Sequence, residues 1–180
     1  MKMEKENPMK KMRIEKLTLN VGAGKDAKVL EKGTMLLKAL TGIDPVKTKT
    51  MKRLQAWGLR PGLPVGCKIT IRDQDHIKEL LPRLLDAKDK TLRLKMFDNY
   101  GNISFGIPEC IDITDYKYDP KIGIMGLQVS LTLARPGYRV MRRRLHRSGI
   151  KKDHLISRDE AIDFMKKNYS VTISEEVDEE

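Results

Sequence analysis

Three segments of the 180-residue chain alternate between aliphatic and polar side chains, and this pattern constrains the fold more than any other feature. In the second segment Cys67 and Ile69 fall on one side, while Lys68 and Thr70 fall on the other. A period of two residues is that of a strand with one buried face and one face toward solvent. We therefore predict β-strands over residues 12–21, 65–72 and 124–133.

Two further segments have the repeat of an amphipathic helix. Residues 26–40 are followed by Gly42 as a C-terminal cap, and a second helix begins after Asp73 or Asp75. The second helix has apolar residues at i, i+3, i+4, i+7 and i+8, although Pro82 interrupts it and predicts a kink. Its predicted buried stripe is Ile77, Leu80, Leu81, Leu84 and Leu85.

The remaining local signals are weaker. Ile14 and Glu15 fit the alternation of the first strand poorly. Ser157 and Glu160 have the spacing of a capping box and predict the start of a last helix. Short strands are predicted over residues 46–50 and 171–173, and after a turn at residues 99–102.

These elements predict an α+β fold: an antiparallel β-sheet with helices packed on one face, an open polar face and long basic loops. We expect a single domain over residues 12–173, a flexible N-terminal arm over 1–11 and an acidic disordered tail over 174–180. Two distant cysteines argue against a zinc ribbon or a disulfide scaffold. With no apolar run of membrane-spanning length and no signal peptide, the sequence predicts a cytoplasmic protein.

The charge of the chain favours a polyanionic partner. Lys and Arg number 36 against 25 Asp and Glu, which gives a net charge of +11. Residues 46–72 contain seven Lys or Arg and no acid, and residues 135–152 contain eight and no acid. Segments that carry only positive charges are more typical of a nucleic-acid-binding surface than of an ordinary solvated surface, which mixes both signs. The second block lacks the apolar aromatic face that a membrane-surface helix needs, so no membrane partner is expected.

The loop over residues 51–64 is too long for a tight hairpin and must project. Its Pro and Gly residues predict a tip without regular backbone pairing. We expect Trp57, the only tryptophan, to be exposed there beside cations, a set that suits phosphates and bases. The alternative is that Trp57 folds back as a core anchor.

The sequence gives little support for a catalytic or metal-binding site. The stretch 22–25 is similar to a phosphate-binding loop, but Leu19 stands where the motif needs Gly and Asp26 follows in place of Ser or Thr. The three histidines lack triad or metal-ligand spacing, and the acids of residues 107–121 lack that of a calcium loop. We predict no enzyme, no cofactor and no metal site. A nucleotide-binding enzyme using residues 22–25 is the alternative.

Five segments in order resemble the ribosomal protein L5 family, in its archaeal and eukaryotic form. They are LNVGAG (19–24), LTGIDPVKTKTMK (40–52), GLRPGLPVGCKITIR (58–72), FDNYGNISFGIPE (97–109) and ARPGYRVMRRR (134–144). One departure is Ile43-Asp44-Pro45, where the family often has Gln-Lys-Pro; Asp44 would weaken phosphate attraction there.

The resemblance implies a structural protein of the large ribosomal subunit that binds 5S rRNA and helps to attach it to the large rRNA in the central protuberance. It also implies that the projecting loop contacts P-site tRNA and that another surface forms a bridge to a small-subunit head protein. Combined with the charge pattern, it predicts three groups of contact residues. For 5S rRNA these are Lys16, Thr18, Asn20, Lys47, Lys49, Lys68, Thr70 and Arg72. For tRNA they are Lys52, Arg53, Trp57 and Arg60, and for the large rRNA they are Arg135, Arg139, Arg142, Arg143, Arg144 and Arg147.

Overall fold

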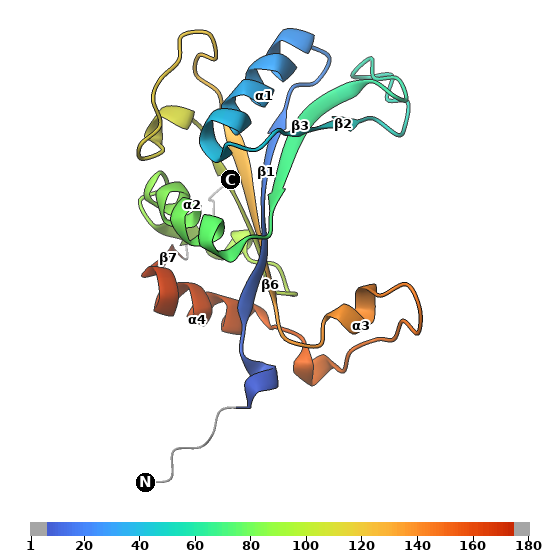
Figure 1. The fold of residues 1–180 in the computed structure, drawn as a ribbon, viewed down its shortest axis with the longest axis vertical. Coiled ribbons are helices and arrows are strands. Elements are labelled where there is room, and N and C mark those ends of the chain that lie inside the picture. The colour runs from blue at the N-terminus through green and yellow to red at the C-terminus, as the bar shows by residue number, and fades with distance from the viewer. Residues whose placement is uncertain (1–6, 175–180) are drawn as a thin grey trace.

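A computed structural model describes residues 7–174 as a five-stranded sheet with its three longer helices on one face and a short helix projecting from the other side (Figure 1). The strand order is β2-β3-β1-β6-β5, and every neighbouring pair is antiparallel. The strands are β1 (Arg13–Gly22), β2 (Val46–Lys49), β3 (Pro64–Ile71), β5 (Asn102–Ile107) and β6 (Leu127–Ala134). The helices are α1 (Ala27–Thr41), α2 (Gln74–Asp86), α3 (Arg139–Arg142) and α4 (Arg158–Tyr169). The predicted α+β fold with a mainly antiparallel sheet is thus confirmed.

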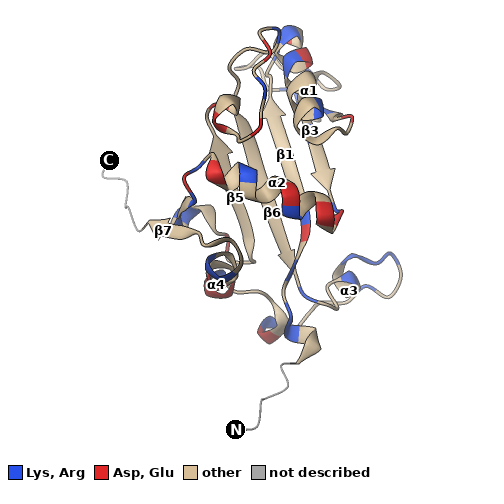
Figure 2. Cartoon of the chain, turned by 60° about the vertical axis from the view of Figure 1, so that its left-hand side comes forward, with Lys and Arg blue, Asp and Glu red and all other residues tan. Residues whose placement is uncertain are grey.

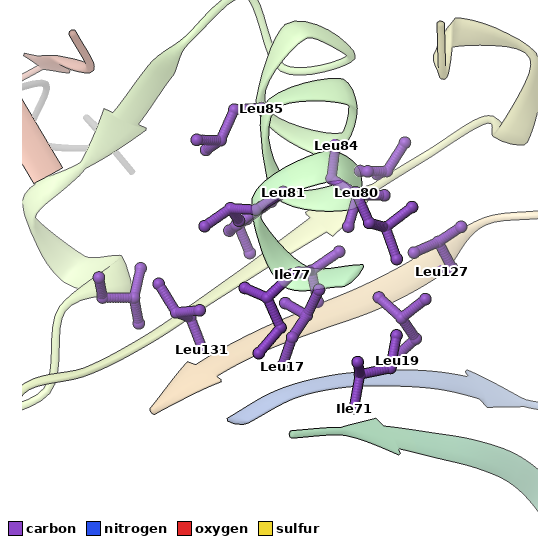
Figure 3. Packing of buried hydrophobic residues seen from close by; sticks show 14 of the residues in the cluster. Leu17, Leu19, Ile71, Ile77, Leu80, Leu81, Leu84, Leu85, Leu127 and Leu131 are labelled. Carbon is purple, nitrogen blue, oxygen red and sulfur yellow. The ribbon is translucent and has the colours of Figure 1, made fainter. Parts of the chain in front are cut away.

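The hydrophobic core fills the space between the sheet and the helices. Alternate residues of β1, including Leu17 and Leu19, are fully buried and face α2 (Figure 3). On α2 the buried residues are the five of the predicted stripe: Ile77, Leu80, Leu81, Leu84 and Leu85. Helix α1 packs closest to the sheet at Gly33, where a Cβ would lie 3.0 Å from Val21 Cγ1 and 3.2 Å from Cys67 Sγ. A side chain at this position would require the side chain of Val21 or Cys67 to shift by a few tenths of an ångström.

The helix ends follow their predicted capping chemistry. Asp73 caps α2 by accepting a hydrogen bond from the backbone N–H of Asp75, and the helix continues through Pro82. Gly42 ends α1 in the left-handed conformation with φ 69°, which glycine adopts without steric penalty. Ser157 and Glu160 form the full capping box of α4. These ends fix where each helix meets the sheet.

Several element boundaries differ from the sequence prediction. Strand β6 begins at Leu127, three residues after the predicted start, and Ile124 is exposed. Residues 121–126 are irregular, and the backbone passes close to Pro108 at Gly126, where a Cβ would lie 2.8 Å from the Pro108 carbonyl oxygen. Ile14 is buried because β1 shifts register between Ile14 and Lys16, a bulge that accounts for the broken alternation.

A second, two-stranded sheet was not predicted. Its strands, β4 (Thr91–Arg93) and β7 (Thr172–Ser174), run parallel. The short strand predicted at residues 171–173 is therefore present, shifted by one residue. Its partner β4 was not predicted, because it lies in a charged segment without periodicity. The short 3₁₀ turns are Pro8–Lys10, Leu94–Met96, Cys110–Asp112 and Lys152–His154. Of the predicted N-terminal arm (residues 1–11) and acidic tail (residues 174–180), residues 1–6 and 175–180 lie outside the described residues, and Pro8–Lys10 of the arm forms one of these turns.

Candidate nucleic-acid interface

The face of the sheet opposite the helices presents rows of short polar side chains. The middle row crosses four strands, because Thr18 pairs with Thr70 on one side and with Ser130 on the other, and Ser130 pairs with Ser104. The two serine hydroxyls lie 3.1 Å apart. The neighbouring rows are Lys68, Asn20 and Gln128 on one side, and Lys16, Thr132 and Asn102 on the other. We call this surface the open face.

The open face can recognise a sugar–phosphate backbone, but it lacks the means to stack bases. Its rows contain hydroxyls, amides and two lysines, and none of their residues is aromatic. The Asn20 amide donates to the Gln128 side chain over 3.4 Å, so these groups are held in place while further hydrogen-bonding capacity is left. Short polar groups can bond ribose hydroxyls and phosphates across a shallow surface with little loss of side-chain entropy.

The structure brings together five of the eight residues predicted to bind 5S rRNA: Lys16, Thr18, Asn20, Lys68 and Thr70. Lys47 does not join them. It pairs with Cys67, whose side chain is buried on the helical side of the sheet, so Lys47 lies on the opposite face from Lys68. Burial raises the pKa of the Cys67 thiol, and the Lys47 charge partly counteracts this effect. Lys49 pairs with Pro64 beyond a register shift, and Arg72 follows the end of β3.

The projecting loop between β2 and β3 is more ordered than its sequence suggested. Thr50 donates its backbone N–H to the Leu63 carbonyl, and Leu54 and Leu59 exchange two backbone hydrogen bonds. The loop thus has no regular strand pairing, as predicted, but an isolated bridge joins Leu54 to Leu59 across a tight turn in which Gly58 adopts φ 62°. Trp57 at this turn is 67% exposed, whereas Leu59 is buried. Lys52, Arg53 and Arg60 are also exposed.

The basic segment of residues 135–152 forms α3 and the loop after it (Figure 2). Arg139, Arg143, Arg144 and Arg147 are exposed, and Arg143 Nε donates to the His146 carbonyl over 2.7 Å. Arg142 forms an ion pair with Glu15 of β1. Sequence reasoning did not include Glu15 in the site, although its break in the strand alternation was the signal that marks it.

Arg135 requires a correction, because the structure makes it a buried structural residue. Only 5% of its side chain is exposed. Its guanidinium donates to the carbonyls of His154 and Leu155 and, over 2.7 Å, to the carboxylate of Glu160. It therefore ties the end of β6 to the start of α4. A guanidinium held in this way is not presented to an RNA phosphate, and the sequence alone could not reveal a partner 25 residues away.

The same contacts lower the pKa of Glu160. Partial burial by itself would raise this pKa, but hydrogen bonds from the Ser157 backbone and from Arg135, together with the Arg135 charge, hold it below its ordinary value. A group whose pKa is lower in the folded state stabilises the fold above its unfolded pKa, and this stabilisation is lost as pH falls through the folded value. We expect Glu160→Gln to flatten the acid side of the stability–pH curve, as measured by urea unfolding from pH 7 to pH 3. Asp163→Asn, an exposed acid on the same helix, should leave that slope unchanged.

The remaining sequence candidates occupy ordinary structural positions. Residues 22–25 form the turn from β1 to α1, where the Lys25 ammonium reaches toward Gly58 of the projecting loop. Across residues 7–174 no three His, Cys, Asp or Glu side chains cluster closely enough to hold a metal ion. No helix in that range is long and apolar enough to cross a bilayer.

Two family models and several known proteins match this chain over most of its length. A family model described as ribosomal protein L5 matches residues 7–60, and a second one, which describes the C-terminus of the same ribosomal family, matches residues 64–164. The large ribosomal subunit protein uL5 of Sulfolobus acidocaldarius is 44% identical over 172 residues, 96% of either chain. The uL5 proteins of Nitrosopumilus maritimus (44% over 169 residues, 94% of this chain and 97% of the relative) and Nanoarchaeum equitans (46% over 168 residues, 93% and 99%) are similar.

These relatives are named as ribosomal proteins and not as enzymes, in agreement with the prediction for this chain. The matches extend over both the open face and the basic segment, so they cover the whole candidate interface. The five resembling segments are spread over the same range. The chain belongs to the ribosomal protein L5 family.

Proposed function

We propose that this protein is a structural component of the large ribosomal subunit that binds 5S rRNA through its open face. The observation that carries the proposal is the set of aligned polar rows, flanked on the same side of the sheet by two basic projections (Figure 1). One projection is the loop between β2 and β3, and the other is α3 with the loop after it. Membership of a family whose relatives are named as large-subunit proteins supports this function.

The two projections extend the proposed interface beyond 5S rRNA. The exposed arginines of the α3 segment would hold the large rRNA through its phosphates and so help to attach 5S rRNA in the central protuberance. Trp57 and the cations around it would contact P-site tRNA, because an exposed aromatic beside cations suits bases and phosphates. A surface away from the RNA would form the bridge to a small-subunit head protein.

Binding of 5S rRNA through the open face predicts a selective loss in one double variant. Asn20→Ala combined with Thr70→Ala should weaken 5S rRNA binding by about 1–3 kcal/mol, because two hydrogen-bonding groups are lost from a desolvated surface. A filter-binding competition between 5S rRNA and an unrelated RNA of equal length measures the effect.

A matched control changes the same residue types on the helical side. Asn168 lies on α4, and Thr114 lies beside α2, where its carbonyl accepts a hydrogen bond from Arg83. Replacing both with alanine should leave 5S rRNA binding unchanged. Equal affinity of the open-face variant and this control would show that 5S rRNA binds elsewhere.

A further inference from the structure

An arginine-lined cavity lies at one end of the open face, beyond the row that contains Lys16 and Thr132. Arg13 pairs with Ala134 in the next part of the register, and both line a cavity of about 190 Å³. Its other walls come from Glu15, Arg135, Gly137, Tyr138, Arg139 and Arg142. Helix α3, whose Arg139 and Arg142 line the cavity, projects from the same side of the sheet as the open face (Figure 1).

The bulge in β1 places Glu15 in this cavity. The register shift between Ile14 and Lys16 adds Glu15 to the strand, and Glu15 is the only acid among the residues that line the cavity. One oxygen of its carboxylate contacts the Arg142 guanidinium. The other oxygen is buried and has no hydrogen-bond partner among the described residues. Because one of its two oxygens is buried without a hydrogen bond, the Glu15 carboxylate is bound less favourably among these arginines than an oxyanion whose oxygens were all satisfied.

The rear wall of the cavity is fixed before any ligand arrives. Arg135 is tied to Glu160 and to two backbone carbonyls, so its charge is already balanced. The Tyr138 hydroxyl accepts from the Ile156 N–H over 2.9 Å and donates to the His154 carbonyl over 3.3 Å. Arg13 and Arg139, which also line the cavity, are by contrast exposed. With Arg142 they give three arginines against one carboxylate.

We propose that this cavity is a phosphate-binding subsite of the RNA interface and that the Glu15 carboxylate holds the phosphate's place on Arg142 in the free protein by pairing with its guanidinium. The inference rests on the proposed function, because it assigns an RNA phosphodiester as the incoming anion. Phosphate and carboxylate are both oxyanions that a guanidinium can bind through two parallel hydrogen bonds. Exchange of one for the other keeps Arg142 paired, and Glu15, 26% exposed, turns to solvent. Glu15 thus competes with RNA from within the chain.

The test is Glu15→Gln, which keeps the shape of the side chain and removes its charge. Binding of in vitro transcripts of 5S rRNA and of the large rRNA is measured across a salt series. For at least one transcript we expect affinity to rise roughly two- to fivefold, the range set by a partly exposed ion pair. The slope of log K against log salt should stay close to that of the parent, because one phosphate contacts Arg142 in both complexes and only the displacement of Glu15 differs. Asp163→Asn controls for the change in net charge.

A second variant ties the effect to Arg142. In an Arg142→Gln background, Glu15→Gln should bring no gain, because the competing ion pair is already absent. An unchanged or lower affinity of Glu15→Gln for both transcripts would overturn the proposal, and so would an equal gain in the Arg142→Gln background. If Glu15→Gln melts well below the parent, Glu15→Ser repeats the measurement with a shorter neutral side chain.

Two further outcomes separate related explanations. A titration with inorganic phosphate shows whether the cavity takes a free anion: a gain for phosphate without one for either transcript would overturn the RNA subsite. If the parent protein itself binds neither transcript in a salt-dependent manner, the proposed function fails. If the parent binds and Glu15→Gln gives no gain, only the role of the cavity fails.

Discussion

Neutralising Arg143, Arg144 and Arg147 together is expected to make binding of the large rRNA much weaker and much less salt-dependent. All three are exposed in the loop after α3, in a segment without a single acid. Each phosphate contact contributes about 0.7–0.9 to the slope of log K against log salt. Loss of three contacts should therefore reduce the slope by roughly 2.1–2.7. The measurement is a binding isotherm for the triple glutamine variant at several salt concentrations.

Two comparisons make this result specific to the segment. Replacing Lys28, Lys166 and Lys167 with glutamine removes three charges from α1 and α4, and it should change the slope far less. Arg135→Ala should lower the melting temperature but leave the slope nearly unchanged, because its guanidinium is bound to Glu160. An unaltered slope in the arginine variant would show that the loop points away from RNA.

Leu81→Ala is expected to destabilise the protein by about 2–5 kcal/mol, the range for removal of a fully buried leucine. Leu81 is completely buried on the side of α2 that faces the sheet, among other core side chains (Figure 3). For a chain of this size the loss corresponds to a fall of roughly 4–20 °C in melting temperature. Differential scanning calorimetry of the free protein measures it.

Trp57→Ala is the informative contrast, since it removes a larger apolar side chain that is 67% exposed. Its stability should change by no more than about 0.5 kcal/mol, as for other surface substitutions. In reconstituted ribosomes the same variant should release P-site tRNA faster than the parent. A large fall in melting temperature with normal tRNA retention would instead make Trp57 a structural anchor and remove the proposed tRNA contact.

The sequence predicted those features whose signal is local. The stripe of α2 follows from a repeat of 3.6 residues, so all five of its buried leucine and isoleucine positions could be named in advance. The same holds for Thr18, Thr70 and Ser130, because alternation places every second residue of a half-buried strand on one face. Antiparallel pairing then brings the three together without further information.

Features that depend on distant partners could not be predicted. Strand β2 reads Val-Lys-Thr-Lys, with too little contrast between its two sides to show that Lys47 lies on the helical face. Arg135 looked like one more cation of a basic block until Glu160 and the carbonyls around it were in place. Strand β4, with three residues in a charged segment, is too short for any periodicity to appear.

The order of the strands has a consequence for the time course of synthesis. The central strand β1 is made first, yet one of its two partners, β6, follows about a hundred residues later. At roughly 5–20 residues per second, the nascent chain waits about 5–20 seconds between them. During that interval β2, β3 and β1 can pair, but one edge of β1 has no strand beside it and is open to wrong partners. The row that runs from Thr70 through Thr18 and Ser130 to Ser104 is complete only when β6 has emerged, after most of the chain has been synthesised.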